Sequence, residues 1–169
     1  MRVNQKSRLS VIAGAVSAIF FSRTMILVAL GFSSPALAID TTWFGGNGDW
    51  GVGGNWNNGQ PGAGDVAIIN AGTATLGFDS SILGLTQGGG IVSGTGNLTL
   101  TGGSTWSAGT HTGTGSTNFN STLAISGATR KDLTGGRIVN ATGVTTWSGN
   151  TAANNNQIIF SGGTINNSG

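Results

Sequence analysis

The stretch GIVSGTGNLTL, residues 90–100, recurs 19 residues later as GTHTGTGSTNF, residues 109–119. The first, fifth, sixth and seventh positions of both copies hold the same residues, Gly, Gly, Thr and Gly. Weaker copies follow at 136–143 and 163–169. Trp106, in the sequence STWS, recurs 41 residues later as Trp147, in TTWS, which is about two periods of 20. A self-similar period of this length indicates a repeat architecture.

Between the glycines of these repeats lie short runs in which apolar residues alternate with polar ones. Leu98 and Leu100 share a face, and the pairs Leu123/Ile125 and Ile158/Phe160 do the same. Alternation of this kind in Thr-, Ile- and Leu-rich runs predicts β-strands, and glycine permits the positive φ of tight corners. The sequence therefore predicts an all-β solenoid whose stacked coils number four to five after residue 70. The alternative is a flexible Gly/Ser/Thr linker, which would not keep large apolar residues at repeated positions.

The N-terminus has the pattern of a secretory signal peptide. Basic residues occur up to Arg23, an apolar run covers 25–32, and the small residues Ala36 and Ala38 flank Leu37. We predict a signal-peptide helix that is cleaved after Ala38. The alternative is an uncleaved membrane anchor, but Arg23 divides the apolar stretch into runs shorter than the roughly 20 residues that span a bilayer. The predicted organisation is a signal peptide at 1–38, a Trp/Gly-rich capping region at 39–70, and β-helix repeats at 71–169 that are incomplete at the C-terminus.

Removal of the leader changes the charge balance of the chain. Residues 39–169 contain three basic residues and five aspartates, a net charge of −2, and the whole sequence has no cysteine. A nucleic-acid binder needs a clustered basic surface, so this composition argues against nucleic acid as a partner. It also predicts no membrane span once the signal is removed.

The start of the predicted mature region resembles a known family. The stretch WFGGNGDW at 43–50 is followed by Asn55-Trp56, by GQP at 59–61 and by DVAII at 65–69. This order is similar to the first part of autotransporter passengers and of filamentous-haemagglutinin-like β-strand-repeat exoproteins. The resemblance implies a right-handed parallel β-helix at the surface of a Gram-negative cell, exported by dedicated machinery, with structural rather than catalytic residues. The C-terminal translocator barrel of autotransporters is not recognisable here.

The residues that could carry catalysis or bind a metal are few. His111 is the only histidine, and we predict it to be an exposed residue in a glycine-threonine turn rather than part of a Ser-His-Asp triad. The five aspartates are scattered, and the glycine corners lack the aspartates of calcium-binding repeats. We therefore expect no catalytic, cofactor-binding or metal-binding residue and no cofactor.

The five tryptophans are the remaining functional candidates. Trp43, Trp50 and Trp56 either stack on glycans or cover one end of the solenoid, and Trp106 and Trp147 are expected to stack within it. The predicted function is a secreted or surface-exposed structural or adhesive passenger segment of a Gram-negative exoprotein, with glycans or surface proteins as partners. The alternatives are a carbohydrate-active β-helix enzyme of the polysaccharide lyase type and a purely structural spacer.

The two ends of the predicted solenoid differ in sequence. Pro61 and three tryptophans suit a start that does not continue the ladder of strands, whereas 163–169 contains no proline or charged residue. We expect a solenoid that is capped at its start and open at its end, and an isolated chain that self-associates or frays in its last coil.

Overall fold

A computed structural model describes residues 37–149 and 157–169 and confirms the predicted parallel β-helix. The predicted signal peptide up to Ala36 lies outside the described residues, and Ala38 is exposed at their start. The strands of the first coils are β1 (Asp40–Thr42), β2 (Asn47–Asp49), β3 (Val66–Ile69), β4 (Thr73–Leu76), β5 (Ser80–Ile82), β6 (Gly84–Gly94) and β7 (Leu98–Leu100). Those of the later coils are β8 (Ser104–His111), β9 (Ser116–Phe119), β10 (Leu123–Ile125), β11 (Lys131–Thr134), β12 (Ile138–Ala141), β13 (Thr145–Trp147), β14 (Ile158–Ser161) and β15 (Thr164–Asn167).

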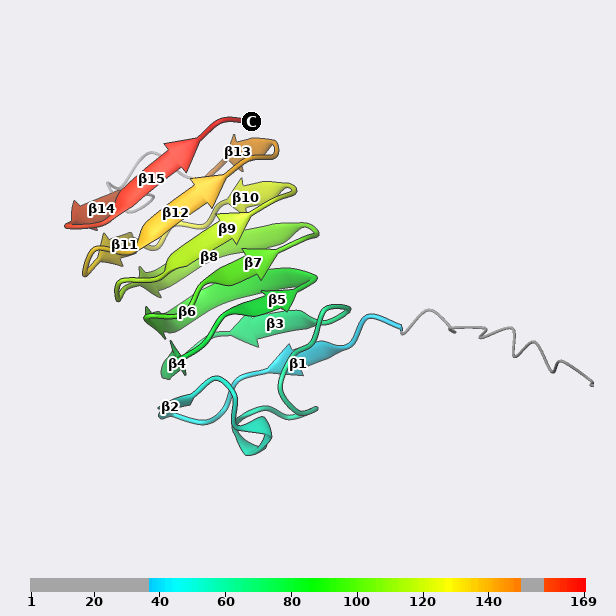
Figure 1. Ribbon diagram of the computed structural model, residues 1–169. Coiled ribbons are helices and arrows are strands. Elements are labelled where there is room, and N and C mark those ends of the chain that lie inside the picture. Colours follow the sequence, from blue (N-terminus) through cyan, green and yellow to red (C-terminus); the bar gives the residue numbers. More distant parts are fainter. Residues whose placement is uncertain (1–36, 150–156) are drawn as a thin grey trace, which may run out of the picture. The chain divides into compact units, whose positions relative to one another are not determined.

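The strands form two sheets that wind around a common interior (Figure 1). The larger sheet A has the order β1-β3-β6-β8-β10-β13 and is widened by β2, β4, β11 and β14. The smaller sheet C has the order β5-β7-β9-β12-β15. Every pair of these strands is parallel. Each coil after the first therefore contributes one long or divided strand to sheet A and one strand to sheet C.

The solenoid has about six turns in all, whereas the expectation of four to five turns counted only the chain after residue 70. The additional turn comes from the region predicted as a cap, because β1 and β2 pair with β3 and β4 and thereby join sheet A. In this first turn no strand of sheet C follows β2. A 3-10 helix, η1 (Gly53–Asn55), and irregular chain occupy the residues up to β3.

The register confirms the sequence period and locates its irregularities. Trp106 lies beside Ile125, and Ile125 lies beside Trp147, so the two tryptophans are two coils apart as the 41-residue spacing predicts. Residues in register are 18 positions apart in sequence between β3 and β6, and mostly 19 apart between β6 and β8. Between β8 and β11 the shift grows to 22 residues, with Gly109 beside Lys131. The extra residues all lie between β10 and β11, so they lengthen one corner and leave the stacked strands in place.

Alternation of side chains fills the interior with apolar residues. In β7, Leu98 and Leu100 are fully buried while Thr99 between them faces outward, as the sequence pattern predicts. Burial of such a side chain contributes roughly 1.5–3 kcal/mol, so the stack of coils stands in for the missing disulfides. The core consists of Trp43, Trp50, Trp56, Ala67, Ile69, Ala74, Leu76, Ile82, Leu85, Val92, Leu98, Leu100, Trp106, Phe119, Leu123, Ile125, Leu133, Val139 and Ala141.

The corner at Gly94 shows why the repeats keep their glycines. Its φ is 107°, a conformation that residues with a side chain rarely adopt. A Cβ placed there would lie 2.1 Å from the Leu76 carbonyl oxygen of the preceding coil. Glycine at this position therefore allows both the turn and the close stacking of the coils.

Candidate functional site

The three tryptophans at the start of the described chain form one packed cluster, called here the tryptophan cap (Trp43, Trp50 and Trp56). Trp56 packs edge-on against both partners, with ring centroids 5.0 Å from Trp43 and 4.8 Å from Trp50. Their exposures are 5%, 0% and 2%. Edge-to-face contacts of this kind add to the stabilisation that burial alone gives.

Hydrogen bonds hold the tryptophan cap in place. The indole N–H of Trp43 donates to the Gly46 carbonyl at 3.0 Å, and that of Trp56 donates to the Trp50 carbonyl at 2.8 Å. Trp43 and Trp56 also form an antiparallel bridge, which folds η1 back against the first coil. Of the two roles weighed for these rings, the packing fits the cap, because stacking on a sugar would require a ring face to leave the core.

His111 does not lie in an exposed turn, so that prediction is wrong. It is the last residue of β8, its side chain is fully buried, and its ring packs edge-on against Trp106 with centroids 4.7 Å apart. The physical reason is strand alternation, since His111 pairs in register with Val92 below and Leu133 above, both of which face inward. The sequence repeat already indicated this inward position, because the 19-residue overlay aligns His111 with the apolar Val92.

Burial also determines the charge of His111. Desolvation, with a smaller contribution from the positive charge of Arg137, lowers the pKa of His111 from 6.5 to about 3. Its Nδ1 lies 3.1 Å from the hydroxyl of Thr117. The imidazole is therefore neutral at pH 7, and in this position it does not contact solvent or a substrate at the surface.

Sequence reasoning missed two cations that lie inside the solenoid. Arg137 is fully buried and links successive coils: its Nε donates to Thr117 Oγ1 at 2.9 Å and its Nη2 donates to the Ser116 carbonyl at 2.9 Å. Its Nη1 donates to the carbonyls of Gly94 and Thr112, each at 3.4 Å. These neutral acceptors compensate part of the cost of burying the charge, and burial lowers the pKa of Arg137 to about 10.

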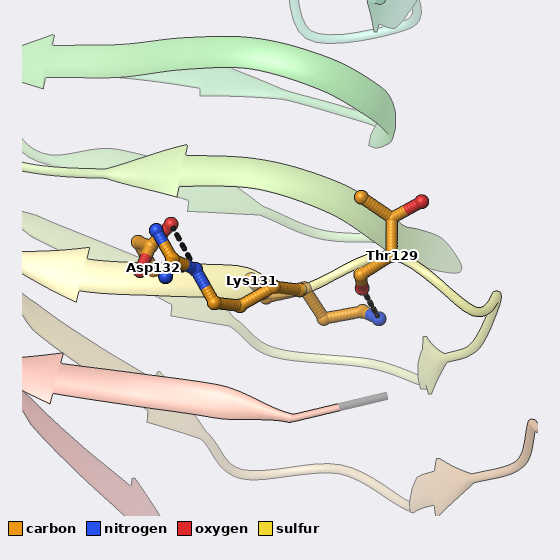
Figure 2. A network of polar contacts seen from close by, with 4 residues as sticks. Thr129, Lys131 and Asp132 are labelled. Carbon is orange, nitrogen blue, oxygen red and sulfur yellow. Dashed lines mark hydrogen bonds and ion pairs between the residues drawn. The ribbon is translucent and has the colours of Figure 1, made fainter. Parts of the chain in front are cut away.

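The second buried cation is Lys131, at the start of β11. Its ammonium donates at 3.0 Å to the carbonyl of Thr129, two residues earlier, where the lengthened corner between β10 and β11 ends (Figure 2). Burial lowers the pKa of Lys131. Next to it, the exposed Arg130 and the outward-facing Asp132 form an ion pair at 3.1 Å. The three clustered charges of 130–132 thus separate into a buried lysine and a surface pair, which composition alone does not reveal.

Three aspartates, Asp49, Asp65 and Asp79, each accept hydrogen bonds in a different part of the chain. Asp49 accepts from the backbone N–H of Gly51 at 2.7 Å, and Asp65 accepts from that of Gly62 at 2.8 Å. Asp79 accepts from the backbone and side-chain nitrogens of Asn97, and these bonds lower the pKa of Asp79. Among the described residues no three His, Cys, Asp or Glu side chains are close enough to hold a metal ion.

The outward face of sheet C carries regular columns of polar side chains. One column climbs through five coils: Ser81, Thr99, Asn118, Asn140 and Asn166. Within it the Asn140 amide donates to Asn118 at 2.8 Å and the Asn166 amide donates to Asn140 at 2.9 Å. The column beside it contains Asp79, Asn97, Ser116, Ile138 and Thr164. Asp79 is the one charged residue of these two columns and Ile138 the one apolar residue, so the face presents mainly hydroxyl and carboxamide groups.

No helix in the described ranges has the length and apolar character needed to cross a membrane. The chain matches no protein-family model, no curated protein and no solved structure.

Proposed function

We propose that this chain is a secreted or surface-displayed structural or adhesive segment of a Gram-negative exoprotein, and that the outward face of sheet C is its contact surface. The observation that carries the proposal is the mainly polar face with a single charge just described, because the ladder of Asn118, Asn140 and Asn166 fixes its amides before any ligand arrives. Groups that are already fixed lose little conformational entropy on binding.

Neutral glycans are the ligand class that this face suits. Hydroxyl and carboxamide side chains both donate and accept hydrogen bonds, which matches the hydroxyl groups of a sugar. With one charged residue in two columns, attraction to a charged polymer would contribute little, and binding would depend weakly on salt. The leader pattern ending at Ala38 and the family resemblance support the surface location.

Glycan binding by the exported protein tests the proposal. The full chain is expressed in a Gram-negative host, the exported form is collected, and its N-terminus is sequenced to check cleavage after Ala38. The protein is then applied to an array of neutral and acidic glycans at low and high salt. We expect retention on neutral glycans that changes little with salt.

Two matched variants localise the binding surface. Thr99→Arg places a bulky residue on the outward face of sheet C, and Thr86→Arg places the same residue on the outward face of sheet A in the same coil. We expect the first to lower glycan retention at least tenfold and the second to leave it unchanged. Equal effects of both variants, or no retention of any glycan by the parent protein, would contradict an adhesive role for this face and favour a spacer.

A further inference from the structure

One edge of β1 is covered by residues 57–59 of the loop that follows η1, called here the strap. Among the described strands β1 pairs only with β3, so the backbone groups on its other edge need other partners. The Asn57 N–H donates to the Thr42 carbonyl at 3.0 Å, and Asn57 Oδ1 accepts from the Thr42 N–H at 2.7 Å. The Thr41 hydroxyl donates to the Gly59 carbonyl at 2.8 Å. The strap therefore closes this edge of sheet A.

Asn58, in the middle of the strap, is exposed and also bonds to β1. Its Nδ2 donates to the Asp40 carbonyl at 2.9 Å. The next residue, Gly59, has a φ of 84°, and a Cβ built on it would meet no atom within 4 Å. Within the described chain the Gly59 N–H donates no hydrogen bond. The strap thus sets an exposed side-chain amide beside an uncrowded backbone nitrogen that no hydrogen bond engages.

The dipeptide Asn-Gly occurs at one other place in the sequence, Asn47–Gly48, and there the fold restrains it. Both residues lie in β2 and pair in register with β4. A Cβ on Gly48 would lie 2.7 Å from Nδ2 of Asn55, so the space around this glycine is crowded. The Gly48 nitrogen could approach the Asn47 side chain only if the strand left its ladder.

We propose that Asn58 is a site of spontaneous chemical modification, at which the chain converts this asparagine to aspartate and isoaspartate. The backbone nitrogen of Gly59 attacks Cγ of Asn58 and forms a five-membered cyclic imide. The Cγ–Nδ2 bond breaks, and ammonia leaves with the proton from the Gly59 nitrogen. Water then opens the ring: addition at Cγ gives aspartate, and addition at the backbone carbonyl carbon gives isoaspartate. Water is the only co-reactant, and no atom is oxidised or reduced.

The modification releases the strap from β1. Either product replaces the amide donor of Asn58 by a carboxylate, which cannot donate a hydrogen bond to the Asp40 carbonyl. In isoaspartate the main chain also runs through the former side chain, which moves the Gly59 carbonyl relative to the Thr41 hydroxyl. The released ammonia is lost to solvent, so the change accumulates with the age of the protein.

Peptide mapping by mass spectrometry tests the site. The exported protein is incubated at mildly alkaline pH, both folded and in concentrated urea. We expect conversion at Asn58 to be at least tenfold faster than at Asn47 in the folded protein, and the two rates to be comparable in urea, where no strand restrains either dipeptide. Asn58→Gln should abolish conversion at this position and leave the rate at Asn47 unchanged, because the longer side chain would have to close a larger ring. Equal rates at the two sites in the folded protein, or an Asn58 that stays intact when folded but converts in urea, would overturn the proposal.

Hydrogen exchange measures the release of the strap. The Thr42 N–H donates to the strap, whereas the Thr73 N–H donates to the Gly46 carbonyl and does not contact it. In fully converted protein we expect Thr42 to exchange at least tenfold faster than before incubation, and Thr73 to exchange at an unchanged rate. The Asn58→Gln variant, compared before and after the same incubation, should show no change at either amide. A Thr42 rate that conversion leaves unaltered would disprove the release.

Discussion

The two ends of this solenoid are built from the same kind of side chain and yet have opposite exposures. At the start of the described chain Trp50 is fully buried, because Trp56 folds back across it. At the other end Trp147 continues the inward column of Trp106 and Ile125 but remains half exposed. The difference shows that burial in a solenoid depends on whether a further coil or a folded-back segment covers the residue, and that its position within a repeat does not suffice.

Truncation of one tryptophan at each end gives the largest expected contrast. Trp50→Ala leaves a cavity in the tryptophan cap and should lower the free energy of unfolding by about 3–5 kcal/mol. Trp147→Ala removes a half-exposed ring and should lower the free energy of unfolding by less than about 1 kcal/mol. Urea unfolding of both variants measures the two values. Comparable losses for the two variants would contradict the distinction between a covered and a half-exposed tryptophan.

Glycine corners provide the next contrast. Gly94 and Gly162 both have positive φ, 107° and 89°, but a Cβ at Gly94 would lie 2.1 Å from a backbone oxygen, whereas one at Gly162 would lie 3.8 Å from the nearest atom. Gly162→Ala should cost about 1 kcal/mol through backbone strain alone. Gly94→Ala adds a clash between coils and should cost about 3 kcal/mol. Thermal or urea unfolding decides between these values, and a smaller loss at Gly94 than at Gly162 would refute the close stacking of coils.

The smallest expected effect is the pH dependence of stability that arises from His111, which is buried in the interior between the two ends. His111 has a folded-state pKa of about 3, below its ordinary value of 6.5, so the unfolded chain binds a proton that the folded chain does not. Stability is unaffected above pH 6.5 and falls as the pH drops from 6.5 toward 3, at roughly 1.4 kcal/mol per pH unit. Between pH 7 and pH 5 the expected loss is about 2 kcal/mol.

A substitution isolates the contribution of His111 to this pH dependence. His111→Leu gives the position the side chain of Leu133, its neighbour in register, and should make stability nearly constant between pH 7 and pH 5. Urea unfolding at several pH values measures both proteins. An unchanged slope in the variant would show that the histidine is hydrated, and the sealed interior would be disproved.

Much of the fold could be predicted from residues whose pattern is local. The 19-residue overlay of 90–100 on 109–119, the alternation of Leu98 and Leu100, and the spacing of Trp106 and Trp147 predicted the strands, the coil period and the two-coil separation that the register confirms. The exposed position predicted for His111 was wrong because it relied on neighbouring residues, while the overlay with Val92 indicated the inward position. Trp147 lies in register over Ile125 and Trp106, in the column where the sequence places it, and it is 54% exposed.

The candidate site was less accessible to sequence reasoning. The column of Ser81, Thr99, Asn118, Asn140 and Asn166 has spacings of 18, 19, 22 and 26 residues, so insertions at the corners hide it from a search with a fixed period. Arg137 gave no signal either, because its four acceptors lie between 20 and 43 residues away in sequence.

The sequence by itself determined the parallel β-helix, because alternation of side chains and glycine corners are properties of a few consecutive residues and each coil repeats them. Only the tertiary structure decided which polar and aromatic side chains are covered. The burial of His111, Lys131 and Arg137, the closure of the tryptophan cap and the exposure of Trp147 all depend on which chain segment lies above or below. Which residues stack on each other depends on the insertions in the corners of several turns. The desolvation and the hydrogen bonds of a side chain follow from that stacking and not from the identity of the residue alone.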